Sequence, residues 1–360
     1  MTKTYKIALL PGDGIGEEVC EQAVKVLNKC EKLFGFSLQF THGLIGGAAW
    51  SKHKNHFPKE TQDLAKNSDA ILFGSVGGPV EAQFEQQWNN CEKNSILAIR
   101  KFLNLSINLR PAPIFSQLTD FCPLKKEIIG NEDFEILVIR ELSQGIYFGE
   151  HSRPSPNEAT DTSQYDRKTI KKVAQFAFKT AQSRNKKLSS VDKANVLETS
   201  RLWREVFEEE AKNYPKVNFE SIYIDNMVTQ LVKNPKQFDV IACPNLFGDI
   251  ISDLTSVLPG SLGMLGSASF GDSVHLYEPS GGSAPDIAGK DIANPIAQIL
   301  SASMMLRFSF KEHSAADAID QAIRNVIKIG YRTGDIFSGK AGEQKVSCSE
   351  MGDVITENIG

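Results

Sequence analysis

The stretch Lys6-Ile-Ala-Leu-Leu-Pro-Gly-Asp-Gly-Ile-Gly16 decides the fold class. Its first part, Lys6–Leu10, is an apolar run that stops at Pro11, which is typical of a short strand buried on both faces. After Gly16, apolar residues recur with helical spacing until Gly35, a common helix terminator: Val19, Ala23, Val26, Leu27, Cys30 and Phe34. A buried strand, a glycine turn and an amphipathic helix in this order predict an α/β fold.

The glycine turn does not match the dinucleotide-binding fingerprint. Gly-x-Gly-x-x-Gly starting at Gly12 requires a glycine at position 17, which is occupied by Glu17. The turn also lacks the Gly-Lys-Ser/Thr of a phosphate-binding P-loop. A tight strand-to-helix turn explains these glycines without a ligand, so the turn alone disfavours a Rossmann nucleotide site.

Similar patterns recur along the chain. Further buried strands are predicted at Ala70–Phe73, Ile136–Ile139, Ser221–Ile224 and Val240–Cys243. Another helix is predicted to stop at Gly330, with apolar positions at Ala316, Ile319, Ile323, Val326 and Ile327. The polar stretch from Glu150 to Arg167 contains two prolines and is either a long surface loop or an arm that reaches a partner subunit. Its composition favours the loop.

Composition excludes several classes of protein. Lys plus Arg total 40 against 44 for Asp plus Glu, so no broad nucleic-acid or membrane-binding surface is expected. The apolar run before Pro11 is too short for a signal peptide or a membrane span. The His53-Lys-Asn-His56 segment is not accompanied by the cysteines or carboxylates of a zinc site, so its two histidines are predicted to be solvated at the surface. Six cysteines without a Cys-x-x-Cys pair predict reduced, mostly buried thiols of a cytoplasmic protein: Cys20, Cys30, Cys91, Cys122, Cys243 and Cys348.

A second glycine-rich stretch, Glu278-Pro-Ser-Gly-Gly-Ser-Ala-Pro-Asp-Ile-Ala-Gly289, precedes Asn294-Pro295 and a predicted helix. Its small residues would let a ligand approach the backbone. The carboxylate of Asp286 could accept hydrogen bonds from ribose hydroxyls and would repel a 2′-phosphate. An ordered loop before a helix is the alternative.

Several charged residues also need an explanation. Asp249 and Asp253 lie four apart after the strand at Val240–Cys243, so they share a helix face. They either benefit from a helix N-terminus or bind a hard cation such as Mg²⁺ or Mn²⁺, and their spacing alone favours the helix terminus. The side chain of Lys193, among small and apolar residues, is either a base with a pKa lowered by desolvation or an ordinary surface lysine.

Three arginines are suited to bidentate capture of carboxylates at strand ends, although scattered arginines are more often surface residues. They are Arg100, Arg110, which is fixed beside Pro111, and Arg140, which ends an apolar run seven residues before Tyr147.

The joint order of these motifs resembles the isocitrate/isopropylmalate family of β-decarboxylating dehydrogenases, over nearly all 360 residues. Within this family, the chain resembles the bacterial enzymes that oxidise 3-isopropylmalate. The resemblance rests on Pro11–Gly16, Asn108-Leu-Arg-Pro111, Arg140-Glu-Leu-Ser-Gln-Gly-Ile-Tyr-Phe-Gly149, Asp192-Lys-Ala-Asn195, Tyr223-Ile-Asp225, Asn245-Leu-Phe-Gly-Asp249 and Gly282-Ser-Ala-Pro-Asp-Ile-Ala-Gly289.

The resemblance implies a two-domain α/β subunit with a mixed central sheet that is not a Rossmann fold, which agrees with the glycine spacing. Residues 1–105 and 260–360 would form a discontinuous cofactor-binding domain, and residues 106–259 a substrate and dimerisation domain. The stretch at about 150–167 would then be an arm that clasps a second subunit, which reverses the preference for a loop and predicts a homodimer with shared active sites.

The resemblance also implies a role for each candidate residue. Arg100, Arg110 and Arg140 would bind the substrate carboxylates. Asp249 and Asp253, with Asp225 of the neighbouring subunit, would hold Mg²⁺ or Mn²⁺, and Asp225 would also lie against the substrate. Lys193 of the neighbour would take the hydroxyl proton during hydride transfer to NAD, and Tyr147 would help to protonate the enolate left after CO₂ departs.

The second glycine-rich stretch would bind NAD, because relatives that use NADP have Lys-Tyr in place of Asp286-Ile287. The expected cofactor-binding set is Glu278, Gly281, Gly282, Ser283, Ala284, Pro285, Asp286, Ile287 and Asn294.

An apolar pocket of Ile96, Leu97 and Val196 would favour 3-isopropylmalate, whose oxidation is a step of leucine biosynthesis. Glu92 lies eight residues before Arg100, a spacing that varies in the family, which leaves its role in doubt. A D-malate or tartrate dehydrogenase of the same family, with a smaller pocket, is the nearest alternative. A non-catalytic dimeric binding protein is the alternative from another class, and it is disfavoured because the base, the acid and all three aspartates are present.

Overall fold

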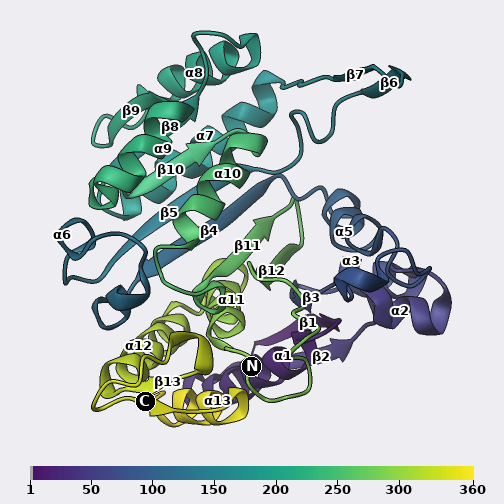
Figure 1. Ribbon diagram of the computed structural model, residues 1–360, viewed down its shortest axis with the longest axis vertical. Helices are drawn as coiled ribbons and strands as arrows, with labels where there is room; N and C mark the ends of the chain where they lie inside the picture. Colours follow the sequence, from purple (N-terminus) through teal and green to yellow (C-terminus); the bar gives the residue numbers. More distant parts are fainter. Residues whose placement is uncertain (1–2) are drawn as a thin grey trace. The chain divides into compact units, whose positions relative to one another are not determined.

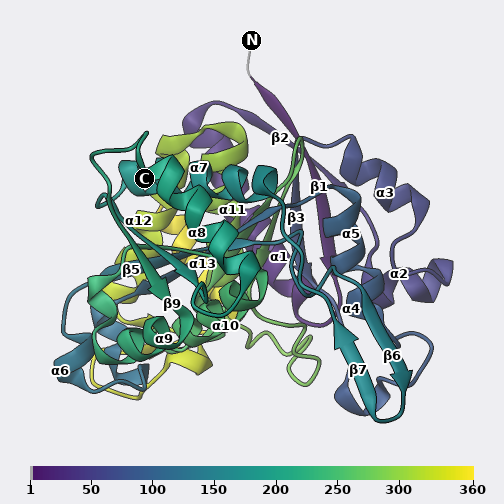
Figure 2. The ribbon, with the colours of Figure 1, turned by 90° about the horizontal axis from the view of Figure 1, so that it is seen from above.

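The computed structural model describes residues 3–360, which fold into two compact units. Unit 1 consists of the residues up to 104 together with residues 261–360, and unit 2 consists of residues 105–260. Figure 1 shows that both units combine strands with covering helices, and Figure 2 gives the view from above. The chain therefore leaves unit 1 once and returns to it.

The strands of unit 1 are hydrogen-bonded in the order β2-β1-β3-β12-β11. Neighbouring strands are parallel except that β11 runs antiparallel to β12, so the sheet of this unit is mixed. The bounds of these strands are β1 Thr4–Gly12, β2 Ser37–His42, β3 Ala70–Ser75, β11 Gly266–Phe270 and β12 His275–Pro279.

Two helices, α1 and α11, pack directly on these strands, and α12 and α13 pack on the two helices. α1 ends where Gly35 adopts a left-handed φ of 76°, as its position in the sequence predicts. The helices of unit 1 are α1 Gly16–Phe34, α2 Gly46–His53, α3 Lys59–Lys66, α4 Cys91–Asn94, α5 Ile96–Phe102, α11 Ile296–Met305, α12 His313–Ile329 and α13 Cys348–Glu357. Short elements complete it: η1 Val80–Ala82, η4 Leu262–Met264, η5 Leu306–Phe310, η6 Gly334–Ile336, β13 Tyr331–Arg332 and β14 Gln344–Lys345.

The strands of unit 2 are hydrogen-bonded in the order β4-β5-β10-β8-β9. Here β4 is antiparallel to β5, and the remaining neighbours are parallel. The bounds are β4 Ile107–Ile114, β5 Phe134–Glu141, β8 Lys187–Asp192, β9 Asn218–Tyr223 and β10 Val240–Cys243.

Helices cover both faces of these strands. Successive residues of a strand point to opposite faces, so neighbouring residues of β8 contact different helices. On β8, Ser190 accepts a hydrogen bond from Trp203 of α8, whereas the next residue, Val191, packs in a core with Met227 of α9 and Ile251 of α10. The helices are α6 Lys126–Ile129, α7 Arg167–Ser183, α8 Glu198–Ala211, α9 Ile224–Lys233 and α10 Asn245–Ser256, with short turns η2 Ser116–Phe121 and η3 Pro235–Gln237.

The predicted strands are found, with one correction. β1, β3, β5 and β10 contain the expected runs, and the central residues of each are buried. The expected strand at Ser221–Ile224 lies in β9, but it is not buried on both faces, because β9 is the last strand of its sheet. Ile224 begins α9 instead of extending the strand.

The polar stretch at 150–167 is not a plain loop. β6 (His151–Ser155) and β7 (Glu158–Asp161) form a separate antiparallel hairpin, and most of its residues are exposed. Figure 1 shows this hairpin extending away from the sheet and helices of unit 2. A hairpin of this kind is marginal by itself in water. Its exposure is compatible with the expected arm.

The histidine prediction is wrong for one of its two residues. His56 is 2% exposed, its ring lies 4.7 Å from that of Trp50, and its Nε2 lies 2.8 Å from the carbonyl oxygen of Gln87. Thus only His53 remains near the surface. The expectation of reduced, mostly buried thiols is confirmed, because all six cysteines are free and buried. Among residues 3–360, no helix has the length and apolar composition needed to cross a bilayer.

Candidate active site

Asp249 and Asp253 lie on α10 of unit 2, but not at its N-terminus. The helix begins at Asn245, and no acidic residue falls in its first turn. Because the stabilisation of an acid by the helix dipole fades beyond the first turn, the helix-terminus explanation is contradicted. Asp249 is instead paired with Arg140 through a close contact from Nη1 to Oδ1.

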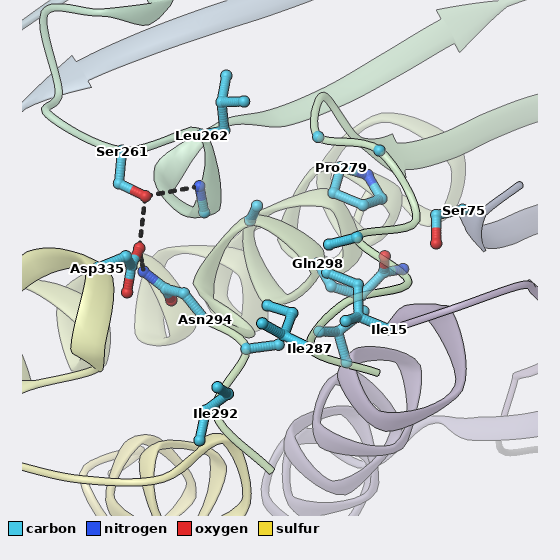
Figure 3. A pocket seen from close by; sticks show the side chains of 17 residues that line it. Ile15, Ser75, Ser261, Leu262, Pro279, Ile287, Ile292, Asn294, Gln298 and Asp335 are labelled. Atoms are coloured by element: carbon cyan, nitrogen blue, oxygen red, sulfur yellow. Dashed lines mark hydrogen bonds between the residues drawn. The ribbon is translucent and has the colours of Figure 1, made fainter. Parts of the chain in front are cut away.

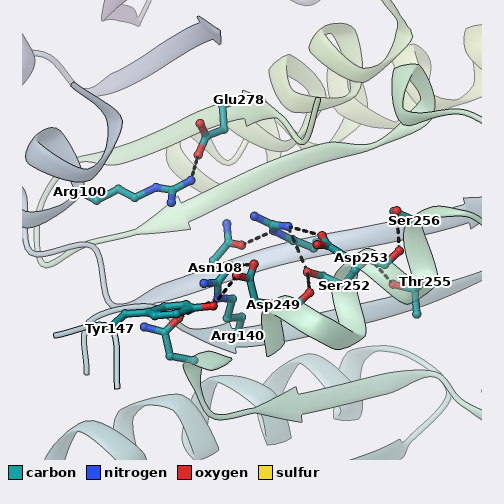
Figure 4. A network of polar contacts seen from close by, with 12 residues as sticks. Arg100, Asn108, Arg140, Tyr147, Asp249, Ser252, Asp253, Thr255, Ser256 and Glu278 are labelled. Carbon is teal, nitrogen blue, oxygen red and sulfur yellow. Dashed lines mark hydrogen bonds and ion pairs between the residues drawn. The ribbon is translucent and has the colours of Figure 1, made fainter. Parts of the chain in front are cut away.

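Arg140, at the end of β5, brings together a cluster of polar residues (Figure 4). It is 5% exposed, and its Nε donates to Asn245 Oδ1 at 2.9 Å. Tyr147 donates its hydroxyl to the other oxygen of Asp249 at 3.0 Å, and its ring lies near the Arg140 guanidinium. Partial burial, followed by the bond to Asp249, raises the pKa of Tyr147. The phenol is therefore held in its protonated form, as a proton donor requires.

Arg110, on β4, lies beside the other aspartate of α10. Its Nε donates to Asn108 Oδ1 at 2.8 Å, and its Nη1 donates to Ser252 Oγ at 3.1 Å. Nη1 also lies 3.7 Å from Asp253 Oδ1, whose side chain is 77% exposed. Unit 2 therefore brings two of the three predicted arginines to the two predicted aspartates, with polar groups that fix the guanidinium planes.

Three residues that orient these arginines were not assigned roles from sequence. Asn108 and Asn245 are completely buried, and Ser252 is 4% exposed. The two asparagines were part of the motifs that carried the family resemblance. A buried amide two residues before Arg110, on the same strand face, is a signal that could have identified Asn108 as its partner.

Lys193 and Asp225 form a pair with each other. Lys193 Nζ donates to Asp225 Oδ1 at 2.6 Å, and their side chains are 28% and 66% exposed. Within residues 3–360 of one chain, no three histidine, cysteine or carboxylate side chains gather as a metal-binding group. Asp225 therefore does not join Asp249 and Asp253 inside one subunit.

In unit 1, Arg100 is paired with a residue predicted to bind the cofactor. Its Nη2 donates to Glu278 Oε1 at 2.7 Å, and its Nε is buried without a partner (Figure 4). Arg100 lies on α5 and Glu278 on β12. A guanidinium with an unused buried N–H can donate to a further anionic oxygen after a small movement.

A pocket of about 220 Å³ lies beside the second glycine-rich loop in unit 1 (Figure 3). Apolar side chains dominate its wall, as is usual for sites that take a small molecule or cofactor. Five of the predicted cofactor residues line it: Gly281, Gly282, Ala284, Ile287 and Asn294. Four do not: Glu278 binds Arg100, Ser283 is buried with its carbonyl bonded to the Ile15 amide, and Pro285 and Asp286 are exposed beside the pocket.

Two polar features of the pocket were not predicted. Asn294 Nδ2 donates to Asp335 Oδ2 at 3.0 Å, and Ser261 donates to the same oxygen, so Asp335 ties three segments together. Gln298, which also lines the pocket, is completely buried, and neither its Oε1 nor its Nε2 has a hydrogen-bond partner. A buried amide without partners is costly, and it is expected where a polar ligand or an ordered water completes the site.

The three residues predicted to form an apolar substrate pocket belong to different units. Ile96 and Leu97 are at the start of α5 in unit 1, with Leu97 43% exposed, and Val196 of unit 2 is 63% exposed. Such exposure of large apolar side chains is compatible with a surface that contacts a ligand.

A family model described as isocitrate/isopropylmalate dehydrogenase matches residues 6–355. The chain belongs to the isocitrate/isopropylmalate dehydrogenase family. A 3-isopropylmalate dehydrogenase of Haemophilus influenzae (strain 86-028NP) is 49% identical to this chain, in an alignment that covers 99% of this chain and 100% of the relative. The 3-isopropylmalate dehydrogenase of Aquifex aeolicus (strain VF5) is also 49% identical, and the alignment covers 99% of this chain and 98% of that relative.

Solved structures of the family have the same fold. An isocitrate dehydrogenase from Methylococcus capsulatus has a TM-score of 0.83 at 33% identity, covering 99% of each chain. A β-decarboxylating dehydrogenase from Thermococcus kodakarensis has a TM-score of 0.80 at 33% identity, covering 99% of this chain and 96% of its own. The predicted family and the predicted α/β fold are confirmed, whereas the roles of single residues stay predictions.

Proposed function

We propose that the chain is a cytoplasmic, NAD-dependent 3-isopropylmalate dehydrogenase. It would convert (2R,3S)-3-isopropylmalate into 4-methyl-2-oxopentanoate and CO₂, a step of leucine biosynthesis. The relatives of that name, matched over nearly the full chain, support this choice over a D-malate or tartrate dehydrogenase. The observation that carries the proposal is the cluster of Arg140, Tyr147 and Asp249, which combines an anion-binding cation, a proton donor and a hard-cation ligand.

Substrate binding is assigned to Arg110 and Arg140 in unit 2 and to Arg100 in unit 1. Each guanidinium is fixed by a buried or nearly buried partner, namely Asn108, Asn245 or Glu278. Fixed guanidinium groups can bind carboxylates through two parallel hydrogen bonds, which also sets the orientation of the substrate. Ile96, Leu97 and Val196 would surround its isopropyl group.

The carboxylates of α10 fit a hard divalent cation. Asp249 and Asp253 offer oxygen ligands on one helix face, and the exposed Asp253 side chain leaves room for ligand exchange. Mg²⁺ or Mn²⁺ bound there would supply Lewis-acid stabilisation of the negative charge that develops during decarboxylation. Asp225 is assigned as the third ligand, from a second subunit, because it lies apart from the α10 pair within one chain.

The two proton-transfer residues serve opposite ends of the reaction. Lys193 would accept the proton of the substrate hydroxyl while NAD, when bound, supplies the hydride acceptor. The bond from C3 to its carboxylate then breaks, and Tyr147 would give its proton to C3. With its pKa raised, the phenol of Tyr147 carries this proton at neutral pH.

We further propose a homodimer in which each active site uses residues of both subunits. Lys193 and Asp225 form one group, and Asp249 with Asp253 forms another. Two such groups from different subunits would complete one site. The β6–β7 hairpin would be the arm that contacts the second subunit.

Unit 1 is proposed as the cofactor-binding domain and unit 2 as the substrate and dimerisation domain. The pocket beside the second glycine-rich loop fits an adenosine group, because its wall is apolar and Gln298 offers an unpartnered buried amide. Glu278, the Gly281–Ala284 backbone, Pro285 and Asn294 would frame the nucleotide. Asp286, exposed beside Ile287 at the pocket, would select NAD by repelling a 2′-phosphate.

The proposal is tested by product analysis with the purified chain, 3-isopropylmalate, NAD and Mg²⁺. NADH, CO₂ and 4-methyl-2-oxopentanoate should form in equal amounts, and EDTA should stop all three. NADH without CO₂ would remove the decarboxylation step, and no NADH at all would favour a non-catalytic protein.

A further inference from the structure

The first glycine turn, whose spacing does not match the Rossmann pattern, contacts the second glycine-rich loop. The amide of Ile15 donates to the carbonyl of Ser283 at 2.8 Å. Ile15 also lines the pocket, together with Gly281, Gly282 and Ala284 (Figure 3). Two glycine-rich stretches that are far apart in the sequence therefore pack against each other beside the pocket in unit 1.

The close approach of the two stretches depends on Gly14. Its φ is +59°, and a Cβ atom placed there would lie 2.0 Å from the carbonyl oxygen of Ser283. A side chain at this position must therefore push the loop away, in addition to straining the backbone. Gly339 has a similar φ of +77° but has nothing within 4 Å of its added Cβ. The chain thus offers a control with the same kind of backbone strain and no collision.

The neighbouring residue, Asp13, anchors the turn from its other side. Its carboxylate, 7% exposed, accepts hydrogen bonds from Gly47 at 2.9 Å, Ala48 at 2.8 Å and Gly77 at 3.0 Å. Its backbone amide donates to Ser75 at 2.7 Å, and its carbonyl accepts from the Ser75 hydroxyl at 2.9 Å. One buried carboxylate therefore fixes the turn to the start of α2 and to the segment after β3.

We propose that Asp13 is a positioning residue for the cofactor site, and that it acts through Gly14 and Ile15 on the loop at Ser283. This inference rests on the proposed binding of NAD by that loop. Asp13 itself touches neither the reacting atoms nor the pocket, since the pocket is lined by Ile15 and Ser75 instead. Its loss would let the turn and the loop shift together, and a shift of this kind weakens binding of the ligand that the loop frames.

Three variants test the proposal: Asp13→Asn, Gly14→Ala and the control Gly339→Ala. Asp13→Asn keeps the shape of the side chain but replaces one acceptor by a donor, so at least one of the three backbone amides loses its partner. We expect Asp13→Asn and Gly14→Ala to raise the KM for NAD and the dissociation constant for NADH about tenfold. The kcat and the KM for 3-isopropylmalate should change less than about twofold.

Gly339→Ala should leave the KM for NAD unchanged even where its melting temperature falls. Equal effects of Gly14→Ala and Gly339→Ala on NAD would overturn the proposal, because strain alone would then explain them. A general loss of kcat in Asp13→Asn would also overturn it, because a positioning role predicts a selective loss of cofactor binding. In Gly14→Ala the Asp13 carboxylate keeps its three amide donors. If Asp13→Asn does not fold, a KM for NAD that Gly14→Ala leaves unchanged would overturn the proposal, because the turn would then not act on the loop.

Direct titration of the unaltered protein with NADH separates this proposal from the proposed function. Binding by the unaltered chain, with no weakening in the two variants, would reject the role of Asp13 alone. An unaltered chain that does not bind NADH would reject the proposed function itself.

Discussion

Arg100 donates to Glu278 at 2.7 Å, with the two side chains only 15% and 9% exposed. One residue is proposed to bind the substrate and the other the cofactor. A substrate carboxylate that binds Arg100 must therefore compete with Glu278 or extend the pair through the unpartnered Nε of the arginine. Binding of the two ligands would thus be connected through one ion pair in unit 1.

We expect this pair to matter for stability as well. Arg100→Met would leave the buried Glu278 carboxylate without its cation, at a cost of about 3–5 kcal/mol in the free energy of unfolding. Urea unfolding of the single variant and of Arg100→Met/Glu278→Met measures this, and the double variant should be the more stable of the two. A double variant less stable than Arg100→Met would contradict the description of Glu278 as a charge that needs its partner.

If the active sites are shared between subunits, two inactive variants should restore activity when they are combined in one dimer. Lys193→Ala should lower kcat by about 10²- to 10⁴-fold, because a proton acceptor is lost, and Asp249→Asn should also be inactive. When the two chains are co-expressed with different tags and the mixed dimer is purified, one of its two sites would contain intact Lys193, Asp225, Asp249 and Asp253.

The mixed dimer should therefore recover close to half of the normal activity, whereas each variant alone remains inactive. Lys168→Ala, at an exposed lysine of α7, serves as the control and should keep full activity. An inactive mixed dimer would show that each site is built within one chain, and it would remove Lys193 or Asp225 from the proposed arrangement.

The choice of cofactor is expected to depend on Asp286 and Ile287. Replacing them together by Lys and Tyr would substitute a cation and a hydroxyl for a carboxylate that repels a 2′-phosphate. The ratio of kcat/KM for NAD to that for NADP should fall at least about tenfold, which corresponds to about 1.4 kcal/mol. Parallel assays with both cofactors measure it, and an unchanged ratio would show that the exposed Asp286 does not contact the ribose.

The β6–β7 hairpin is expected to respond to pH. His151 Nδ1 lies 2.6 Å from Asp161 Oδ1 on the opposite strand, and this hydrogen bond raises the pKa of His151. Since the folded pKa is the higher one, the contribution of the pair is complete below the pKa of an unfolded histidine and is lost as pH rises through the folded pKa.

An NMR titration of the His151 ring tests this directly. Asp161→Asn should return its pKa toward the ordinary value, while Glu158→Gln, across from Ser155 on the same hairpin, should have no effect. A titration of His151 that is identical in all three proteins would contradict the pairing.

Sequence patterns predicted the elements whose defining residues all lie within one continuous segment. The strand, turn and helix from Lys6 to Gly35 are found as expected, because the apolar run, the glycines and the helical period all belong to one continuous segment. β11 was not predicted, because Gly266-Ser-Ala-Ser-Phe270 is buried along its whole length yet consists mainly of small and polar residues. Its place in the sheet is determined by pairing with β12, which sequence patterns do not show.

The candidate site was predictable only in part for the same reason. Spacing placed Asp249 and Asp253 on one helix face but favoured a helix terminus, which the start of α10 contradicts. The pairing of Asp249 with Arg140 depends on a contact between β5 and α10, separated by more than a hundred residues. Likewise, the unpartnered Gln298 and the anchoring role of Asp13 depend on which segments surround them, and no local pattern marks either residue.

The most direct test of the central claim compares three substrates with the purified chain. NADH formation is measured with 3-isopropylmalate, D-malate and isocitrate in parallel, with Mg²⁺ and with EDTA. We predict a kcat/KM for 3-isopropylmalate at least about a hundredfold above the other two, from roughly 3 kcal/mol of binding to an apolar pocket, and its loss with EDTA. A higher kcat/KM for D-malate or isocitrate, or activity that persists in EDTA, would contradict the account.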